Sequence, residues 1–202
     1  LGGRNSGSEA EWAAAEWLAD RMREIGLKKV AKLPYSCDTW QFNGATLTVV
    51  GGDTAGGDVS GSGSDSGGPG AAGSESAPRV IKPYAYASGG TSEGGLTGEL
   101  LYLGKGTAAD YVGVDAAGKI ILIDIDMDAD WWIEYPTIEA ALNGAAAVVS
   151  SCSGGYAAIN DDAMNAQDFC GPVTIPSVNI SHSDAAYLKG LLAGGPVTVN
   201  LV

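Results

Sequence analysis

The sequence contains a single histidine and only three cysteines among its 202 residues. Catalytic zinc is normally held by three protein ligands in which imidazoles predominate, so this chain cannot build a zinc pair from its own histidines. Nucleophilic catalysis with a histidine base would depend entirely on His182, whose place at an expected strand-to-helix junction is more typical of a polar surface residue. We therefore expect no catalytic residues, no metal site and no cofactor in this chain, which is not an enzyme by itself.

Basic residues are also scarce, with 11 lysines and arginines against 24 acidic residues and a net charge of -13. Nucleic-acid binding requires clustered cations that displace counterions, so neither nucleic acid nor an anionic membrane surface is an expected partner. No apolar run approaches the roughly 20 residues that cross a bilayer, so no membrane span is expected. An acidic, lysine-poor chain that has a plausible disulfide suits an extracellular or cell-surface location.

The three cysteines allow one disulfide bridge. Cys152 and Cys170 flank a polar loop, and a bridge between them would remove about 3 kcal/mol of unfolded-state entropy in the chain-entropy treatment. Cys37 would then be unpaired. Reduced, buried thiols at the two flanking positions are the alternative.

The first 50 residues are expected to form one helix and two strands. Apolar residues recur at three- and four-residue spacing over 9–25, two serines precede them as N-cap candidates, and Gly26 favours a left-handed helix end. Further apolar residues within 30–35 and 47–50 predict a hairpin whose turn is Asn43-Gly44. This part is interpreted as a separate N-terminal domain.

The composition changes at Gly51, because residues 51–78 contain ten glycines, six serines and no aromatic residue. Such a segment cannot bury enough apolar surface to offset the entropy lost on ordering its backbone. The pattern predicts a flexible loop or linker here, followed by a domain over 79–202.

The second half has the pattern of a compact α/β unit. The runs 100–103 and 120–123 are apolar throughout, which suits strands that are covered on both faces. Pro136 can open a short helix, and Ser183 can cap another helix before a final strand at 197–201.

An acidic row follows the second of these apolar runs. Asp124, Asp126, Asp128 and Asp130 alternate with other residues, and a period of two would place all four on one strand face. Like charges repel, so that face must be hydrated, neutralised by cations of the protein, or bound to a hard ion such as calcium. An EF-hand is excluded, because the sixth residue of the row is Ala129 where that loop needs glycine.

The densest aromatic group comes directly after the acidic row. Trp131 and Trp132 are adjacent, so they cannot both point inward on an extended segment. Either the group packs in the core, or Trp131, Trp132 and Tyr135 include a contact residue for a partner or substrate.

Several blocks of the sequence are similar to known families. The opening residues 3–9 and the helix end at 23–27 resemble the start of the zinc aminopeptidases related to glutamate carboxypeptidase and transferrin receptor. Four later blocks resemble a protease-associated domain, and they are residues 98–106, 114–123, 139–149 and 175–181.

This resemblance implies an α/β fold in which a swivelling three-layer β/β/α protease-associated domain is inserted after the first helix and strands of a peptidase domain. Catalysis in the family uses two zinc ions bound by His, Asp and Glu side chains that follow the insertion. This sequence has no His-x-Asp and no second histidine, and it stops at Val202, where the catalytic part should resume.

The resemblance therefore implies a non-catalytic protease-associated region that shapes substrate access or mediates protein contacts. Its expected partners are the catalytic domain of the parent peptidase, which would hold the zinc, and peptide or protein substrates. A stand-alone module of the same fold that binds protein or glycan is the alternative.

Overall fold

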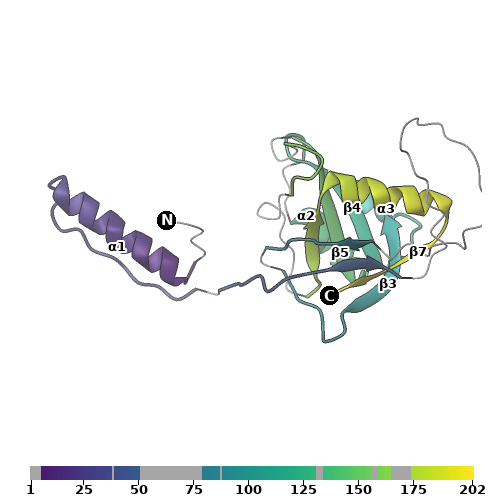
Figure 1. Cartoon of the computed structure of the whole chain (residues 1–202), viewed down its shortest axis with the longest axis horizontal. Helices are drawn as coiled ribbons and strands as arrows, with labels where there is room; N and C mark the ends of the chain where they lie inside the picture. Colours follow the sequence, from purple (N-terminus) through teal and green to yellow (C-terminus); the bar gives the residue numbers. More distant parts are fainter. Residues whose placement is uncertain are drawn as a thin grey trace, which may run out of the picture. The chain divides into compact units, whose positions relative to one another are not determined.

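The structure is a computed structural model, and Figure 1 shows its arrangement. It divides into two compact units, of which the first ends at Asn43 and the second begins at Gly44. The described residues are 6–37, 39–50, 79–86, 88–130, 134–155, 159–164 and 174–202.

The first unit is built on helix α1, Glu9–Glu24. Ser8 caps the helix in an extended conformation, and its Oγ accepts a hydrogen bond from the backbone N–H of Glu11 at 3.2 Å. At the other end Gly26 has a φ of +91°, the left-handed conformation expected of a residue that terminates a helix. The predicted helix is confirmed, and it ends one residue earlier than the pattern indicated.

The predicted hairpin in the first 50 residues is wrong. Residues 30–35 form no strand, and Gly44 has a φ of +133° in an open connection rather than in a two-residue turn. The segment instead runs beside α1, where Lys32 forms an ion pair with Glu16 and lies 5.3 Å from the ring centre of Trp12. The strand expected at 47–50 exists, but its partners lie in the second unit.

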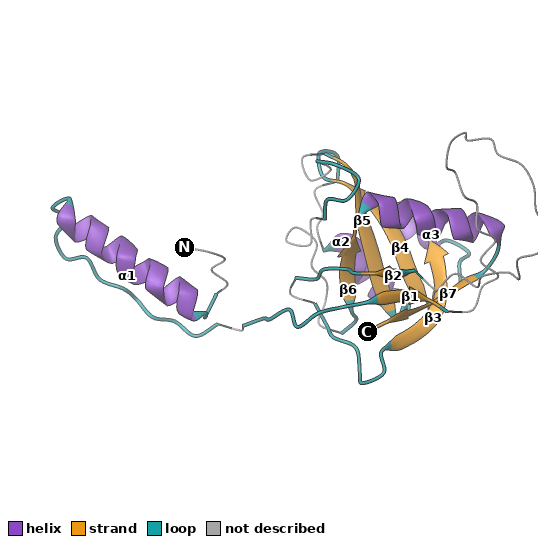
Figure 2. Ribbon diagram, in the orientation of Figure 1, coloured by secondary structure: helices purple, strands orange, loops and turns teal. Residues whose placement is uncertain are grey.

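The second unit contains a seven-stranded mixed sheet with the order β2-β1-β7-β3-β4-β5-β6 (Figure 2). Strands β3, β4, β5 and β6 run parallel to one another, and β7, β1 and β2 are joined by antiparallel pairing. This confirms the α/β class. The strands are β1 Leu47–Val49, β2 Val80–Ile81, β3 Leu96–Tyr102, β4 Ile120–Asp126, β5 Ala147–Gly154, β6 Ser177–Ile180 and β7 Val197–Leu201, and the helices are the 3-10 turn η1 Ala108–Tyr111, α2 Tyr135–Leu142 and α3 His182–Gly194.

The domain organisation differs from the one expected from composition. Leu47 pairs with Ile81 and Thr48 with Val80, so β1 and β2 are antiparallel neighbours in one sheet. Residues 51–78 connect these two strands of the second unit and do not separate two domains. Their predicted flexibility falls outside the described residues. The boundary lies at Asn43 because the apolar residues of β1 are buried against the sheet.

The segment 80–86 links the first and last strands of the sheet. Its residues alternate between buried and exposed, with Ile81 paired to β1. Tyr84, which is three residues after Ile81, exchanges two backbone hydrogen bonds of 2.9 and 2.7 Å with Asn179 of β6. Three extended residues span only about 10 Å. The sheet is therefore curled, so that its two ends approach each other across this segment.

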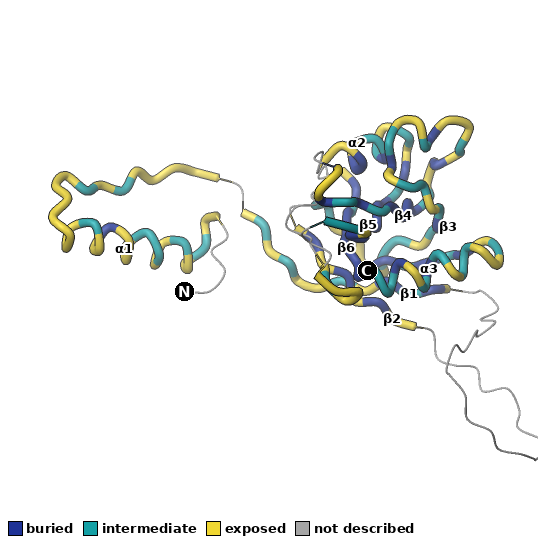
Figure 3. The backbone as a smooth tube through the Cα atoms, turned by 90° about the horizontal axis from the view of Figure 1, so that it is seen from above, coloured by how far each residue is buried: buried dark blue, intermediate teal, exposed yellow. Residues whose placement is uncertain are grey.

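The two helices of the second unit cover opposite faces of the sheet. Helix α2 packs through Ala140 in a core that includes Ile121 and Ile123, whereas Lys189 of α3 reaches Asp124, which points the other way on the same strand. Residues Ile120 to Ile123 are completely buried, which confirms that this run is covered on both faces. In Figure 3 the strands are mostly dark blue, whereas α1 is mostly yellow and teal.

Candidate functional site

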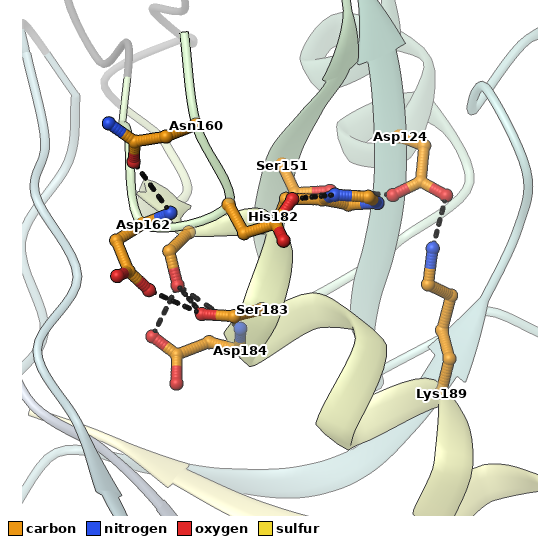
Figure 4. Close-up of polar contacts among 10 residues, drawn as sticks. Asp124, Ser151, Asn160, Asp162, His182, Ser183, Asp184 and Lys189 are labelled. Atoms are coloured by element: carbon orange, nitrogen blue, oxygen red, sulfur yellow. Dashed lines mark hydrogen bonds and ion pairs between the residues drawn. The ribbon is translucent and has the colours of Figure 1, made fainter. Parts of the chain in front are cut away.

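Polar side chains gather where the parallel strands β4, β5 and β6 end and helix α3 begins (Figure 4). The carboxyl ends of parallel strands are the usual location of binding sites in α/β proteins, because the loops that follow them converge at one edge. This edge is therefore the candidate functional site of the second unit.

Asp124, near the end of β4, is the centre of the most connected polar group, which we call the Asp124 network. Its Oδ2 accepts hydrogen bonds from Lys189 Nζ at 2.7 Å and from the Tyr102 hydroxyl at 2.8 Å. Its Oδ1 accepts one from Ser151 Oγ at 2.6 Å. The network joins β3, β4, β5 and α3, so it fixes the helix to the sheet.

Burial by itself raises the pKa of the Asp124 carboxyl, but hydrogen bonds from Lys189, Ser151 and Tyr102, with the charge of Lys189, outweigh burial and hold this pKa below its usual range. Burial, with the hydrogen bond to Asp124 as the next cause, raises the pKa of Tyr102 to about 12. Asp124 is thus an ionised acceptor whose two oxygens are already occupied. Such a carboxylate is suited to positioning a helix and poorly suited to accepting a proton as a general base.

The N-terminus of α3 is capped by its own side chains. Ser181 is extended, and its Oγ accepts a hydrogen bond from the Asp184 N–H at 3.1 Å while donating to the Asp184 carboxylate at 2.8 Å. Arg79 pairs with Asp184 at 2.5 Å and lies 4.6 Å from the ring centre of Tyr187. These contacts fasten the residue that precedes β2 to the helix.

His182 is the first residue of α3, in the strand-to-helix position that the sequence predicted. Its Nδ1 lies 3.4 Å from Asp161 Oδ1, and both side chains are exposed. Ser183 strengthens this contact between the loop at 159–164 and the helix, because its N–H donates to the Asp161 carbonyl and its Oγ donates to Asp162 at 2.8 and 2.9 Å. The contacts of His182 serve to hold a loop.

The acidic row does not lie on one face, so that prediction is wrong. Strand β4 ends at Asp126, and the chain turns at 127–129 so that the Asp130 N–H donates to the Asp126 carbonyl at 2.7 Å. Asp130 is buried, and its carboxylate accepts hydrogen bonds from Lys105 Nζ at 2.7 Å and from the Asp126 N–H at 3.0 Å. Asp128 is exposed. The turn therefore disperses the four carboxylates, and two lysines neutralise two of them.

The predicted aromatic contact group is described only at Tyr135. Trp131 and Trp132 lie outside the described residues. Tyr135 begins α2, and its hydroxyl accepts a hydrogen bond from the Ala108 N–H at 3.0 Å, which ties η1 to the helix. The interpretation of this group as a partner or substrate contact stays a prediction.

The predicted disulfide also stays a prediction. Cys152 is buried on β5 in the core beneath α2, but Cys170 lies outside the described residues. Cys37 is exposed in the first unit.

Sequence reasoning missed the Asp124 network as a whole. The missed signal was the single lysine of α3, combined with a carboxylate that directly follows the apolar run at 120–123. Lys189 and Asp124 are 65 residues apart, so no local pattern shows that the two side chains meet.

The residues of this edge do not fit a zinc site. Among the residues that the structure describes, no group of three or more His, Cys, Asp and Glu side chains is placed to hold a metal ion. The single imidazole contacts one carboxylate, and Asp124 is already occupied by three donors.

No protein-family model and no curated protein sequence matches the chain. Across its described part, no helix is both long and apolar enough to cross a membrane. The fold, in contrast, matches those of solved peptidases.

An M28 peptidase precursor from Shewanella amazonensis SB2B matches the whole chain with a TM-score of 0.70 at 18% identity, over 43% of its own length. The zinc aminopeptidase BSAP from Bacillus subtilis matches the whole chain with a TM-score of 0.55 at 21% identity, over 40% of its length. An aminopeptidase from Aneurinibacillus sp. strain AM-1 matches it with a TM-score of 0.54 at 19% identity, also over 40% of its length. The chain thus has the fold of a part of these peptidases and spans about two fifths of their length.

Proposed function

We propose that the chain is a non-catalytic region of a larger zinc-dependent peptidase. The observation that carries the proposal is the coverage of the structural matches, in which all of this chain corresponds to about two fifths of each peptidase. The single histidine and the absence of a metal-binding group among the described residues support a role outside the catalytic centre.

We further propose that the second unit is a protease-associated domain. The four blocks that resemble such a domain fall on consecutive parts of the observed sheet: the end of β3 with its turn, strand β4, the end of α2 with β5, and strand β6. These are the four parallel strands of the unit. A family resemblance that coincides with one continuous structural feature is better supported than the same number of scattered matches.

In this proposal the second unit shapes the access of peptide or protein substrates to a catalytic domain. That domain would bind the zinc ions and carry out hydrolysis, so no chemical step is assigned to residues of this chain. The protein would act outside the cell or at its surface. The aromatic residues Trp131, Trp132 and Tyr135 remain the proposed contact group for substrate or partner.

The test compares the purified 202-residue chain with the polypeptide from the complete reading frame that contains it. Each is incubated with zinc and aminoacyl chromogenic substrates. We expect turnover from the complete polypeptide and none from the 202 residues. Turnover that follows the 202-residue chain through purification would refute a non-catalytic role, and an inactive complete polypeptide would refute the peptidase assignment.

One observation favours the alternative of a stand-alone module that binds protein or glycan. The second unit has its own apolar core on both faces of the sheet, so it has the basis for folding alone. Trp131→Ala and Trp132→Ala separate the possibilities. A lower melting temperature would indicate a core role, whereas unchanged stability with lost binding to a protein or glycan would indicate a recognition surface.

A further inference from the structure

The sequence contains two Asn-Gly pairs with closely similar neighbours, Asn43-Gly44 and Asn143-Gly144. In each pair the main-chain nitrogen of glycine can attack the side-chain amide of the preceding asparagine, because glycine has no Cβ to hinder the approach. A large apolar residue precedes each pair and an alanine follows it, so the intrinsic chemistry of the two pairs is matched. A difference in their reactivity must therefore come from the folded structure.

The structure leaves the pair Asn43-Gly44 open. Both residues are exposed and lie outside any helix or strand. Within the described part of the chain, neither the Asn43 side-chain amide nor the Gly44 N–H takes part in a hydrogen bond. Gly44 has a φ of +133°, and a Cβ added there would meet nothing within 4 Å. The two reacting groups are thus unrestrained, and the space around Gly44 is open.

The pair Asn143-Gly144, in contrast, is fixed at the end of α2. The Asn143 Nδ2 donates to the main-chain carbonyl and to the carboxylate of Glu139, at 2.9 and 3.2 Å. The Gly144 N–H, which would supply the attacking nitrogen, donates to the Ala141 carbonyl at 3.1 Å. The Gly144 carbonyl accepts a hydrogen bond from the Gly118 N–H at 2.8 Å. Both reacting groups of this pair are therefore held by hydrogen bonds.

The backbone angle of Asn143 also opposes the reaction. The five-membered ring that forms requires the glycine nitrogen and the asparagine Cβ to lie on the same side of the Cα–C bond. Asn143 has a ψ of 9°, which instead places the Gly144 nitrogen beside the main-chain nitrogen of Asn143 and away from Cβ. Closing the ring would require the end of α2 to unwind.

We propose that Asn43 is a site of spontaneous deamidation and that the fold protects Asn143. The Gly44 nitrogen loses its proton to solvent base and forms a bond to Asn43 Cγ. The Cγ–Nδ2 bond breaks, and the amide group takes up a proton and leaves as ammonia. Water then opens the ring. Cleavage of the bond between the nitrogen and Cγ gives aspartate, whereas cleavage of its bond to the main-chain carbonyl carbon gives isoaspartate.

The modification changes the chain at a defined point. Either product adds a negative charge to a chain whose net charge is already -13. The isoaspartyl product also lengthens the main chain by an atom shortly before the part that joins the sheet, since Thr46 and Val202 exchange two backbone hydrogen bonds of 2.9 Å. This chemistry involves only adjacent residues, so the inference goes beyond the proposed function and does not depend on it.

The test ages the purified 202-residue chain in mildly alkaline buffer at physiological temperature and follows both pairs by peptide mass spectrometry. Deamidation changes the peptide mass by the difference between an amide and an acid, and chromatography separates aspartyl from isoaspartyl peptides. Digestion at mildly acidic pH keeps the reaction slow during sample preparation. The same incubation in concentrated urea gives the reactivity of the unfolded chain. Asn43→Gln is the matched variant, because its longer side chain would have to form a larger and less favourable ring.

We expect position 43 to deamidate at least about tenfold faster than position 143 in the native chain, because several hydrogen bonds must open before the second pair can react. In urea the two rates should be similar, and Asn43→Gln should abolish the fast reaction of the native chain. Equal rates at the two positions in the native chain would overturn the inference, as would a position 43 that reacts in urea but stays intact in the native chain. A position 143 that remains slow in urea would also overturn it, since the fold would then not be the source of the difference.

Discussion

Replacing Asp124 with asparagine tests whether the Asp124 network holds α3 on the sheet. The carboxylate offers two charged oxygens to Lys189, Tyr102 and Ser151, at 2.6 to 2.8 Å. An amide keeps one neutral oxygen, which can still accept from Lys189 and Tyr102 when its nitrogen faces the Ser151 hydroxyl, a group that accepts as well as donates. The substitution therefore preserves the shape of the side chain and removes the charge that strengthens these hydrogen bonds.

The expected loss of stability follows from these contacts. Hydrogen bonds to a charged group contribute about 1.5–3 kcal/mol each, but the asparagine retains part of this binding and Lys189 is partly solvated, so its ion pair is screened. We expect a net loss of about 2 kcal/mol, or a fall in melting temperature of about 4–8 °C for a chain of this size. Asp128→Asn is the control, because Asp128 is exposed, and its effect should stay within about 0.5 kcal/mol.

The pH dependence of this difference gives a second readout. The folded protein holds the pKa of Asp124 below the value of an unfolded aspartate, so its ionisation stabilises the fold above that value and the contribution is lost as the pH falls through the folded pKa. Urea unfolding followed by circular dichroism should show a constant difference between wild type and Asp124→Asn from about pH 5 to 8, which shrinks below about pH 4. Equal stability of Asp124→Asn and Asp128→Asn, or a difference from wild type that is no smaller at pH 3 than at pH 6, would refute the reasoning.

Three further substitutions test other parts of the structure. The pKa of Tyr102 is raised to about 12, so the wild type should lose stability as the pH rises from about 10 towards 12. Tyr102→Phe should show a smaller loss in alkaline urea titrations, and the loss that remains includes the contribution of Tyr111, whose pKa burial also raises. Ser181→Ala removes the N-cap of α3 and should lower the unfolding free energy by about 1 kcal/mol in urea, whereas an unchanged midpoint would show that the cap is dispensable. Gly155→Ala should lower the melting temperature more than Gly113→Ala, because both glycines have positive φ but only at 155 would the added Cβ meet backbone, 2.5 Å from the Asp128 nitrogen. Equal effects at the two glycines would contradict this local packing.

The elements that the sequence predicted correctly depend on neighbouring residues. Helix α1 has its serine cap and its apolar spacing within one segment, and the run at 120–123 is apolar throughout, so each is visible in a short window. The α/β class followed from several such windows.

The errors arose where long-range contacts decide the structure. Residues 47–49 favoured a local hairpin, yet β1 pairs with β7, about 150 residues later, because that strand completes the burial of Leu47. The acidic row has a strand period, but the chain turns after Asp126, and the hydrogen bonds of Asp130 stabilise that turn. Lys189 could not be assigned to Asp124, because only the packing of α3 on the sheet brings them together.

The short crossing from β2 to Tyr84 limits how this domain can recognise a polypeptide. Outer sheet margins commonly capture extended peptides, whose main chain adds as one more strand. Here the outer strands are β2, which is only two residues long, and β6, where Asn179 already pairs with Tyr84 of the same chain. An extended peptide would thus find only a short main-chain template along these two margins of the described sheet, and its recognition would have to rest mainly on side chains and loops.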